Sequence, residues 1–238
     1  MALVTESTAE NWPELFQEQA FTVQDERLRA FYEQGTVAGD VPLSDVPFVA
    51  LDFETTGLNA DSDEIISIGL VPFDLNRIRL REARHWLLKP RRAMKDESIV
   101  IHGITHTELS DAPDLNRILE QVLEAIAGRI VVVHYRYIER EFLDAALQRR
   151  ISEGIRFPMV DTMELEAMLY RRGVGQLMKR LIGCKPESIR LGDSRSRYNL
   201  PHYGQHHALT DAIATAELLQ AQVLHRYSRI TPLKEIWI

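Results

Sequence analysis

The chain has 238 residues, of which 45% are hydrophobic and 26% are charged, and its formal net charge is −7. This composition predicts a soluble globular protein. It excludes a membrane-spanning chain, since no apolar run is long enough, and it disfavours a protein that coats duplex nucleic acid through its charge. Residues 1–19 lack the basic segment and apolar core of a signal peptide, and Cys184 is the only cysteine, so no internal disulfide can form. We therefore expect a cytoplasmic location.

The first 46 residues differ from the rest of the chain and are expected to form a helical extension followed by a linker. Apolar side chains recur at helical spacing between Trp12 and Gln34, which predicts one or two helices. Glycine and proline are then frequent in residues 35–47. We expect the extension to pack against a main domain at 47–228, with a tail at 229–238. An arm that docks a partner protein is the alternative.

Strands come first in the main domain, and helices alternate with strands after them. Three apolar segments separated by short turns predict an antiparallel meander. Later segments alternate between helical periodicity and short β-branched runs, so the expected fold class is α/β with a mixed sheet. The predicted strands are 48–54, 64–73, 78–88, 130–133 and 157–160, and the predicted helices are 114–127, 137–150, 161–170, 174–182 and 208–225.

Two carboxylates, Asp52 and Glu54, stand two positions apart in the apolar run that opens the main domain. Side chains two residues apart in a strand point to the same face, so both acids share one face. Two ionised carboxylates at the end of a buried strand repel each other and are poorly solvated unless cations neutralise them. The pair therefore predicts a metal site, although a loop anchor or helix cap is the ordinary role of such a pair taken alone.

Two later helices each carry an acid that could reach this pair. Glu139 lies in the first turn of a helix that follows a strand, at the sheet edge where the sites of α/β proteins assemble. Asp211 adjoins the apolar stripe of the final helix, and His206 precedes that helix in a loop. Taken singly, Glu139 would be a favourable charge in a first helical turn and His206 an ordinary loop residue.

Together these residues resemble the motifs of the DEDDh 3′–5′ exonucleases, a family that includes the proofreading epsilon subunits of bacterial replicative polymerases. The resemblance covers residues 47–226 and implies an RNase H-like fold, a mixed five-stranded sheet flanked by helices. The second motif departs from the family pattern, because Glu139 replaces the usual aspartate and Tyr135 the usual asparagine. The matching segments are Asp52-Phe53-Glu54-Thr55-Thr56-Gly57, His206 with Ala208 and Asp211, and Ile101-His102-Gly103-Ile104-Thr105.

The resemblance implies a metal-dependent 3′–5′ exonuclease that hydrolyses phosphodiester bonds at the 3′ end of single-stranded or frayed DNA and releases nucleoside 5′-monophosphates. Its cofactors would be two divalent cations, Mg²⁺ or Mn²⁺. Asp52 would bridge the cations, and Glu54 and Asp211 would complete the first metal site. Glu139 would assist through a water molecule, and His206 would be the general base. The expected contacts to the substrate strand are Thr55, Thr56, Leu58 and His102.

Two other functions stay open at this stage. One is an exoribonuclease of the same family. The other is a catalytically silent module that binds nucleic acid or a polymerase, which the unusual Glu139 and Tyr135 motivate. The segment before the final helix is expected to be a solvated loop, with a path for the substrate backbone as the alternative. Its candidate residues are Arg190, Arg195, Arg197 and Tyr198.

Overall fold

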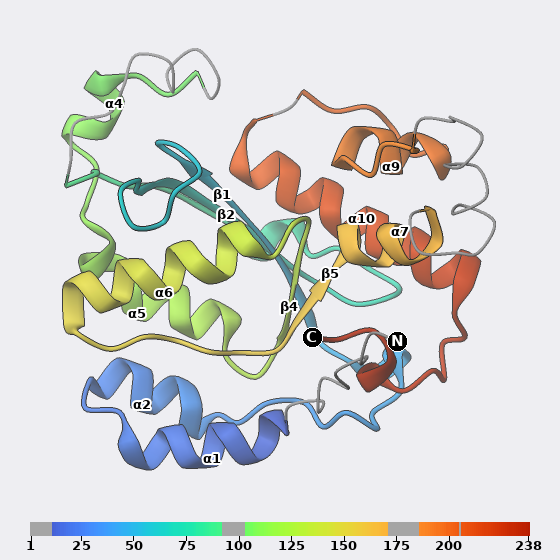
Figure 1. The fold of residues 1–238 in the computed structure, drawn as a ribbon, viewed down its shortest axis with the longest axis horizontal. Coiled ribbons are helices and arrows are strands. Elements are labelled where there is room, and N and C mark those ends of the chain that lie inside the picture. The colour runs from blue at the N-terminus through green and yellow to red at the C-terminus, as the bar shows by residue number, and fades with distance from the viewer. Residues whose placement is uncertain (1–10, 92–102, 171–185, 205) are drawn as a thin grey trace, which may run out of the picture.

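The computed structural model describes residues 11–91, 103–170, 186–204 and 206–238. These residues form a mixed five-stranded sheet with helices on both faces (Figure 1), which confirms the predicted fold class. The strand order is β3-β2-β1-β4-β5. β2 pairs antiparallel with both β1 and β3, and β4 pairs parallel with both β1 and β5. The strands are β1 (Phe48–Thr55), β2 (Ile65–Phe73), β3 (Arg84–Leu87), β4 (Ile130–Val133) and β5 (Met159–Asp161). The helices are α1 (Trp12–Thr22), α2 (Glu26–Glu33), α4 (His106–Ser110), α5 (Leu115–Ile126), α6 (Tyr137–Ile151), α7 (Thr162–Tyr170), α9 (Leu191–Arg197) and α10 (Ala208–Arg226).

The central strand β1 buries a different core on each face, because its side chains alternate between the two. Leu51 and Phe53 belong to the core that the sheet shares with α1, α2, α5 and α6. Ala50 belongs to the second core, which lies between the sheet and α10. By the same alternation, Asp52 and Glu54 point to the α10 face of the sheet.

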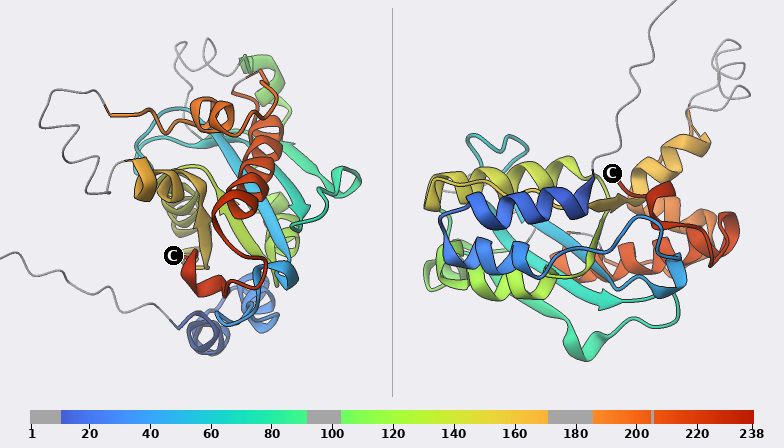
Figure 2. Two further views of the ribbon diagram at one scale, coloured as in Figure 1. Left: turned by 90° about the vertical axis from the view of Figure 1, so that its right-hand side faces the viewer. Right: turned by 90° about the horizontal axis from the view of Figure 1, so that it is seen from below.

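The N-terminal segment forms two helices that pack against each other, and α2 also packs against α5 (Figure 2). Phe16 contacts both Phe31 and Tyr32, with ring centroids 5.4 and 5.1 Å apart. The buried Tyr32 hydroxyl accepts a hydrogen bond from the Arg156 backbone N–H at 2.9 Å. The helices predicted between Trp12 and Gln34 are therefore confirmed, and their aromatic side chains extend the core on the α5 and α6 side of the sheet.

The segment after α10 returns to the sheet. Leu233 and Ile236 are buried in the core on the α10 side. The Ile238 backbone N–H donates to the Met159 carbonyl oxygen at 2.8 Å, and the Met159 N–H donates to the Ile238 carbonyl oxygen at 3.2 Å. Residues 229–238 thus pack against the domain and extend the pairing at the β5 edge.

A close approach between β2 and α10 determines where the final helix begins. Gly69 of β2 is the cross-strand partner of Asp52. A Cβ atom at Gly69 would lie 2.2 Å from both the Ala208 carbonyl carbon and the Leu209 nitrogen. Only a residue without a side chain permits this contact, which brings the first turn of α10 against the sheet beside Asp52.

The structure also differs from the predicted elements. The third predicted strand is shorter, because its first, charged half forms an exposed 3₁₀ turn at Leu80–Glu82. The last strand begins at Met159, where pairing with β4 starts. Helices α4 and α9 were not predicted: α4 is short and begins with a capping box, and α9 lacks an apolar stripe. The predicted helix 174–182 and Cys184 lie outside the described residues. Among the helices described, none is long and apolar enough to span a membrane.

Candidate active site

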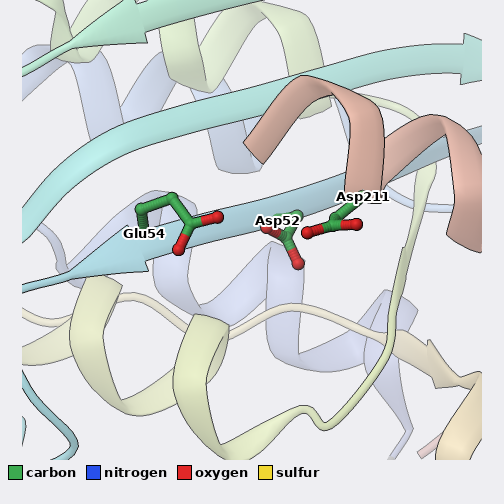
Figure 3. Close-up of side chains that lie close together, drawn as sticks. All are labelled: Asp52, Glu54 and Asp211. Carbon is green, nitrogen blue, oxygen red and sulfur yellow. The ribbon is translucent and has the colours of Figure 1, made fainter. Parts of the chain in front are cut away.

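Three carboxylates meet where β1 and α10 lie side by side. Asp52 and Glu54 come from β1, and Asp211 comes from the first turn of α10 (Figure 3). Ligand oxygens of the three side chains all lie within 4.8 Å of one another. Glu54 is buried, and the other two side chains are half-buried. The predicted convergence of residues about 160 positions apart in the chain is therefore confirmed.

Glu139 approaches the same place from the N-terminal turn of α6. Its side chain is only 2% exposed, and its Oε2 atom has no hydrogen-bond partner among the described residues. Glu139 does not belong to the group of three within 4.8 Å, but its charge contributes to the raised pKa of Asp52. The structure therefore places Glu139 beside the three carboxylates but outside their group, with a buried oxygen that lacks a hydrogen-bond partner.

The pKa values of three acids in this cluster are raised, because burial and mutual repulsion disfavour their ionised forms. Burial raises the pKa of Asp52 well above its usual range, and the charges of Glu139, Glu54 and Asp211 raise it further. Burial likewise raises the pKa of Glu139, which backbone N–H groups of Glu139 and Phe53 partly oppose. Burial also raises the pKa of Asp211. Converging oxygens and an orphaned buried oxygen fit a hard divalent cation, which prefers oxygen ligands.

His206 stands at the entrance to α10 with a positive φ of 66° and an exposed side chain. Its backbone N–H donates to Asp211 Oδ2 at 2.9 Å, so the histidine and the acid are held to each other. The next residue, His207, is the N-cap of α10, and its ring lies 4.7 Å from that of His85 on β3. His85 in turn lies 2.8 Å from the Ser67 hydroxyl of β2, so this network ties the His206 segment to the sheet.

The turn after β1 is held by its own polar groups. The Thr55 hydroxyl donates to the Gly57 carbonyl oxygen at 2.6 Å, and the Thr56 hydroxyl accepts from the Glu64 N–H at 3.0 Å. A Cβ at Gly57 would lie 2.4 Å from the Asp63 carboxylate, so any other residue at this position would force the Asp63 side chain to shift. Leu58 is 85% exposed at the tip of the turn and is free to meet a substrate. The predicted contact at His102 lies outside the described residues.

Two residues that support the site were not recognised from the sequence. Gly69 permits the close packing of α10, and an isolated glycine inside an apolar strand is a signal for such an approach. Asp161 was predicted only as a helix cap, a role it fills by accepting from the Met163 N–H at 2.9 Å. It also accepts from the Tyr135 and Arg136 N–H groups at 3.0 Å each, which anchors the turn that leads into α6. No local signal in the sequence indicates this second contact.

The predicted backbone path before α10 is wrong for the residues that the structure buries. Arg195 is 3% exposed, and its guanidinium donates to the Ala214 carbonyl oxygen at 2.6 Å and to Glu217 at 2.7 Å. Arg197 donates to the buried Glu166 at 2.6 Å, and the Tyr198 hydroxyl donates to the same carboxylate at 2.8 Å. These side chains join α7, α9 and α10, so they stabilise the fold and are not free to bind phosphates, whereas Arg190, the N-cap of α9, is exposed. A solvated loop is wrong for residues 191–197, which form α9.

A sheet of order β3-β2-β1-β4-β5 with converging acids on its central strand and final helix defines the RNase H-like class of metal-dependent nucleases. Residues 49–219 match a family model described as "Exonuclease", that of the RNase T family. The chain belongs to the RNase T family of exonucleases. Exonucleases of this family normally use divalent metal ions.

Relatives and solved structures agree with this assignment. The chain is 30% identical over 180 residues to "DNA polymerase III subunit epsilon" of Treponema pallidum, covering 76% of this chain and 78% of that protein. It is also 30% identical over 182 residues to "DNA polymerase III PolC-type" of Thermotoga maritima, but covers 12% of that protein, so it spans about an eighth of the PolC-type relatives that it matches.

Two solved structures share the fold. The nuclease domain of 3′hExo, a DEDDh family member bound to rAMP, superposes with a TM-score of 0.61 at 16% identity, covering 75% of this chain and 92% of that one. Exonuclease X in complex with 5′ overhanging duplex DNA gives a TM-score of 0.56 at 21% identity, with the same coverage of 75% and 92%. The RNase H-like fold expected from the sequence is therefore confirmed.

Proposed function

We propose that this protein is a metal-dependent 3′–5′ exonuclease that removes nucleotides from single-stranded or frayed DNA ends and releases nucleoside 5′-monophosphates. The observation that carries the proposal is the convergence of Asp52, Glu54 and Asp211 within 4.8 Å, with the unpartnered oxygen of Glu139 beside them. Membership of the exonuclease family supports the reaction, and the relationship to an epsilon subunit supports DNA as substrate.

The metals proposed are Mg²⁺ or Mn²⁺, because four carboxylates offer only oxygen ligands. Asp52, Glu54 and Asp211 would hold the first cation, with Asp52 shared by a second. Glu139, which lies outside the group of three, would take part directly or through a water molecule. Bound there, the cations would lower the pKa of a water molecule and offset the charge that develops on the phosphate oxygens.

His206 is the proposed general base. A histidine imidazole can accept a proton from water near neutral pH. The Asp211 carboxylate holds the His206 backbone through a 2.9 Å hydrogen bond, while the imidazole stays exposed to solvent and substrate. Leu58, 85% exposed on the turn after β1, would contact the terminal nucleotide, and Thr55 and Thr56 hold that turn in shape.

Digestion of end-labelled oligonucleotides tests the proposal. Matched DNA and RNA strands, each free or blocked at the 3′ or the 5′ end, are incubated with Mg²⁺, Mn²⁺ or EDTA. We expect stepwise shortening of DNA from a free 3′ end in either metal and none in EDTA. Asp52→Asn is the matched inactive variant. Preferential shortening of RNA would make the protein an exoribonuclease, and no shortening of either strand would make it a silent binding module.

The wider context of the protein is part of the same proposal. We assign residues 47–228 to the exonuclease domain, residues 1–46 to an N-terminal extension and residues 229–238 to a tail. A polymerase partner is supported by the names of the relatives, of which the PolC-type proteins are far longer than this chain, and a cytoplasmic location would follow from such a partner. Co-purification of the tagged protein with a replicative polymerase from fractionated cells would test both.

A further inference from the structure

An exposed pair of aromatic rings lies at the start of α6, next to the acidic cluster. Tyr135 and Tyr137 are 43% and 47% exposed, and their ring centroids are 5.4 Å apart. Single exposed aromatic side chains are ordinary on a protein surface, but two in mutual contact are not. In the described part of the chain the other strongly exposed aromatic residues stand apart from them: Phe21 lies on α1, and Tyr203 bonds to Glu217.

The backbone that presents these rings is constrained. Tyr135 has a φ of 93°, a value that bulky residues rarely adopt. Asp161 holds this conformation by accepting from the Tyr135 and Arg136 N–H groups at 3.0 Å each. Backbone strain of this kind persists where surrounding contacts enforce it, and it is frequent at functional sites. The turn therefore presents Tyr135 in one defined position.

The same turn joins the rings to the acidic cluster. Asp161, which anchors Tyr135, also raises the pKa of Glu139 through its charge, so the three residues are neighbours. Figure 1 shows α6 beginning beside β1, the strand that carries Asp52. Tyr137 and Glu139 both lie in the first turn of α6, Glu139 on its buried side and Tyr137 on its exposed side. A strand that reaches the carboxylates from this end of α6 would pass the rings.

The arginine beside the two rings adds little electrostatic attraction for a nucleic acid strand. The Arg136 guanidinium lies 3.6 Å from Asp161 and 3.9 Å from Glu164, so its charge is offset. It also covers the Tyr137 ring, with its Cζ 4.6 Å from the ring centroid, and donates to the Tyr137 hydroxyl at 3.1 Å. Arg136 thus fixes Tyr137 in place and does not supply a free cation. Aromatic stacking, which accepts any base, can supply the affinity that charge does not.

We propose that Tyr135 and Tyr137 form a stacking platform for a nucleobase near the 3′ end of the bound strand. The inference rests on the proposed function, because it names residues that bind that substrate. The ligand is an unpaired base of any identity, since the platform offers ring faces and no pattern of base-specific donors. Loss of one base–aromatic stack should weaken binding about 5- to 100-fold.

Oligonucleotides that carry a single abasic residue at successive positions from the 3′ end test the platform. With the wild-type protein, we expect KM to rise about 5- to 100-fold when the abasic residue occupies the platform position, with little change in kcat. Tyr135→Leu and Tyr137→Leu keep apolar volume but remove the ring. Each variant should raise KM for the intact strand and abolish the extra effect of the abasic residue at that one position.

Conservative and distant variants complete the design. Tyr135→Phe and Tyr137→Phe should restore wild-type KM, and Phe21→Ala, which removes an exposed ring on α1, should leave it unchanged. An abasic penalty of equal size in the wild type and in both leucine variants at every position would overturn the proposal. Binding of the same strands, measured by fluorescence anisotropy in EDTA, gives the same comparison without hydrolysis. Failure of the proposed activity therefore does not hide failure of the platform.

Discussion

Asp52→Asn should stabilise the metal-free fold while it removes the response to metal. The substitution takes one charge from a cluster whose ligand oxygens lie within 4.8 Å of one another and whose Asp52 side chain is poorly hydrated. At 4.8 Å and an effective dielectric constant of about 20, two unit charges repel by about 3.5 kcal/mol. Relaxation and screening by salt reduce this figure, so we expect a net gain of about 1–3 kcal/mol.

Thermal unfolding measured by circular dichroism gives the comparison. In EDTA, Asp52→Asn should unfold about 2 to 12 °C above the wild type, since 1 kcal/mol corresponds to about 2–4 °C for a domain of this size. Adding Mn²⁺ should raise the unfolding temperature of the wild type, because a ligand that binds only the folded state stabilises it. The variant should show little of this rise.

A charge change elsewhere provides the control. Glu18→Gln alters the net charge equally on the exposed side of α1 and should leave both the stability in EDTA and the response to Mn²⁺ unchanged. The reasoning is refuted if Asp52→Asn unfolds at or below the wild-type temperature in EDTA, or if it keeps the full rise with Mn²⁺. The first result would mean that the carboxylates do not destabilise one another as their positions imply, and the second that Asp52 does not hold the metal ion.

Other expectations concern the packing of α10, the base and a buried histidine. Gly69→Ala would place a Cβ 2.2 Å from the backbone of α10, so the helix must shift. We expect the free energy of unfolding to fall by about 1–3 kcal/mol in denaturant titrations and kcat to fall about 100-fold in digestion assays. His206→Ala should lower kcat about 100-fold or more yet leave Mn²⁺ affinity within a few fold by calorimetry; a lost affinity would make His206 a ligand. Burial lowers the pKa of His134 to about 4, so the folded protein keeps this imidazole neutral where the unfolded chain binds a proton. The contribution of His134 to the free energy of unfolding is complete above pH about 6.5 and falls by up to about 3 kcal/mol as the pH drops to about 4. His134→Gln should flatten this pH dependence in denaturant titrations. Equal acid sensitivity of the two proteins would contradict the expectation.

Local patterns were sufficient for the elements that carry the site. The period of two in β1 placed Asp52 and Glu54 on one face, and apolar residues at helical spacing identified α5, α6 and α10. The resemblance to an exonuclease family then indicated that Glu139 and Asp211 converge on that face. The structure brings Asp211 within 4.8 Å of Asp52 and Glu54 and leaves Glu139 outside this group.

What the sequence could not predict depends on contacts between distant segments. The role of Gly69 arises only because α10 lies directly on it, and the second role of Asp161 depends on the turn that leads into α6. The arginines of α9 show the reverse error. Their charge suggested exposure to phosphates, but Arg195 is buried because Glu217 and a backbone carbonyl satisfy its guanidinium. Such pairing cannot be seen in a sequence without the fold.

Crystals of the protein grown with Mn²⁺, measured for anomalous scattering, would examine the acidic cluster itself. We expect an anomalous peak between Asp52, Glu54 and Asp211, with oxygen ligands at coordination distance, and its loss in crystals of Asp52→Asn. Strong Mn²⁺ peaks only elsewhere on the molecule, with these three carboxylates bare, would contradict a metal-dependent nuclease centred on them.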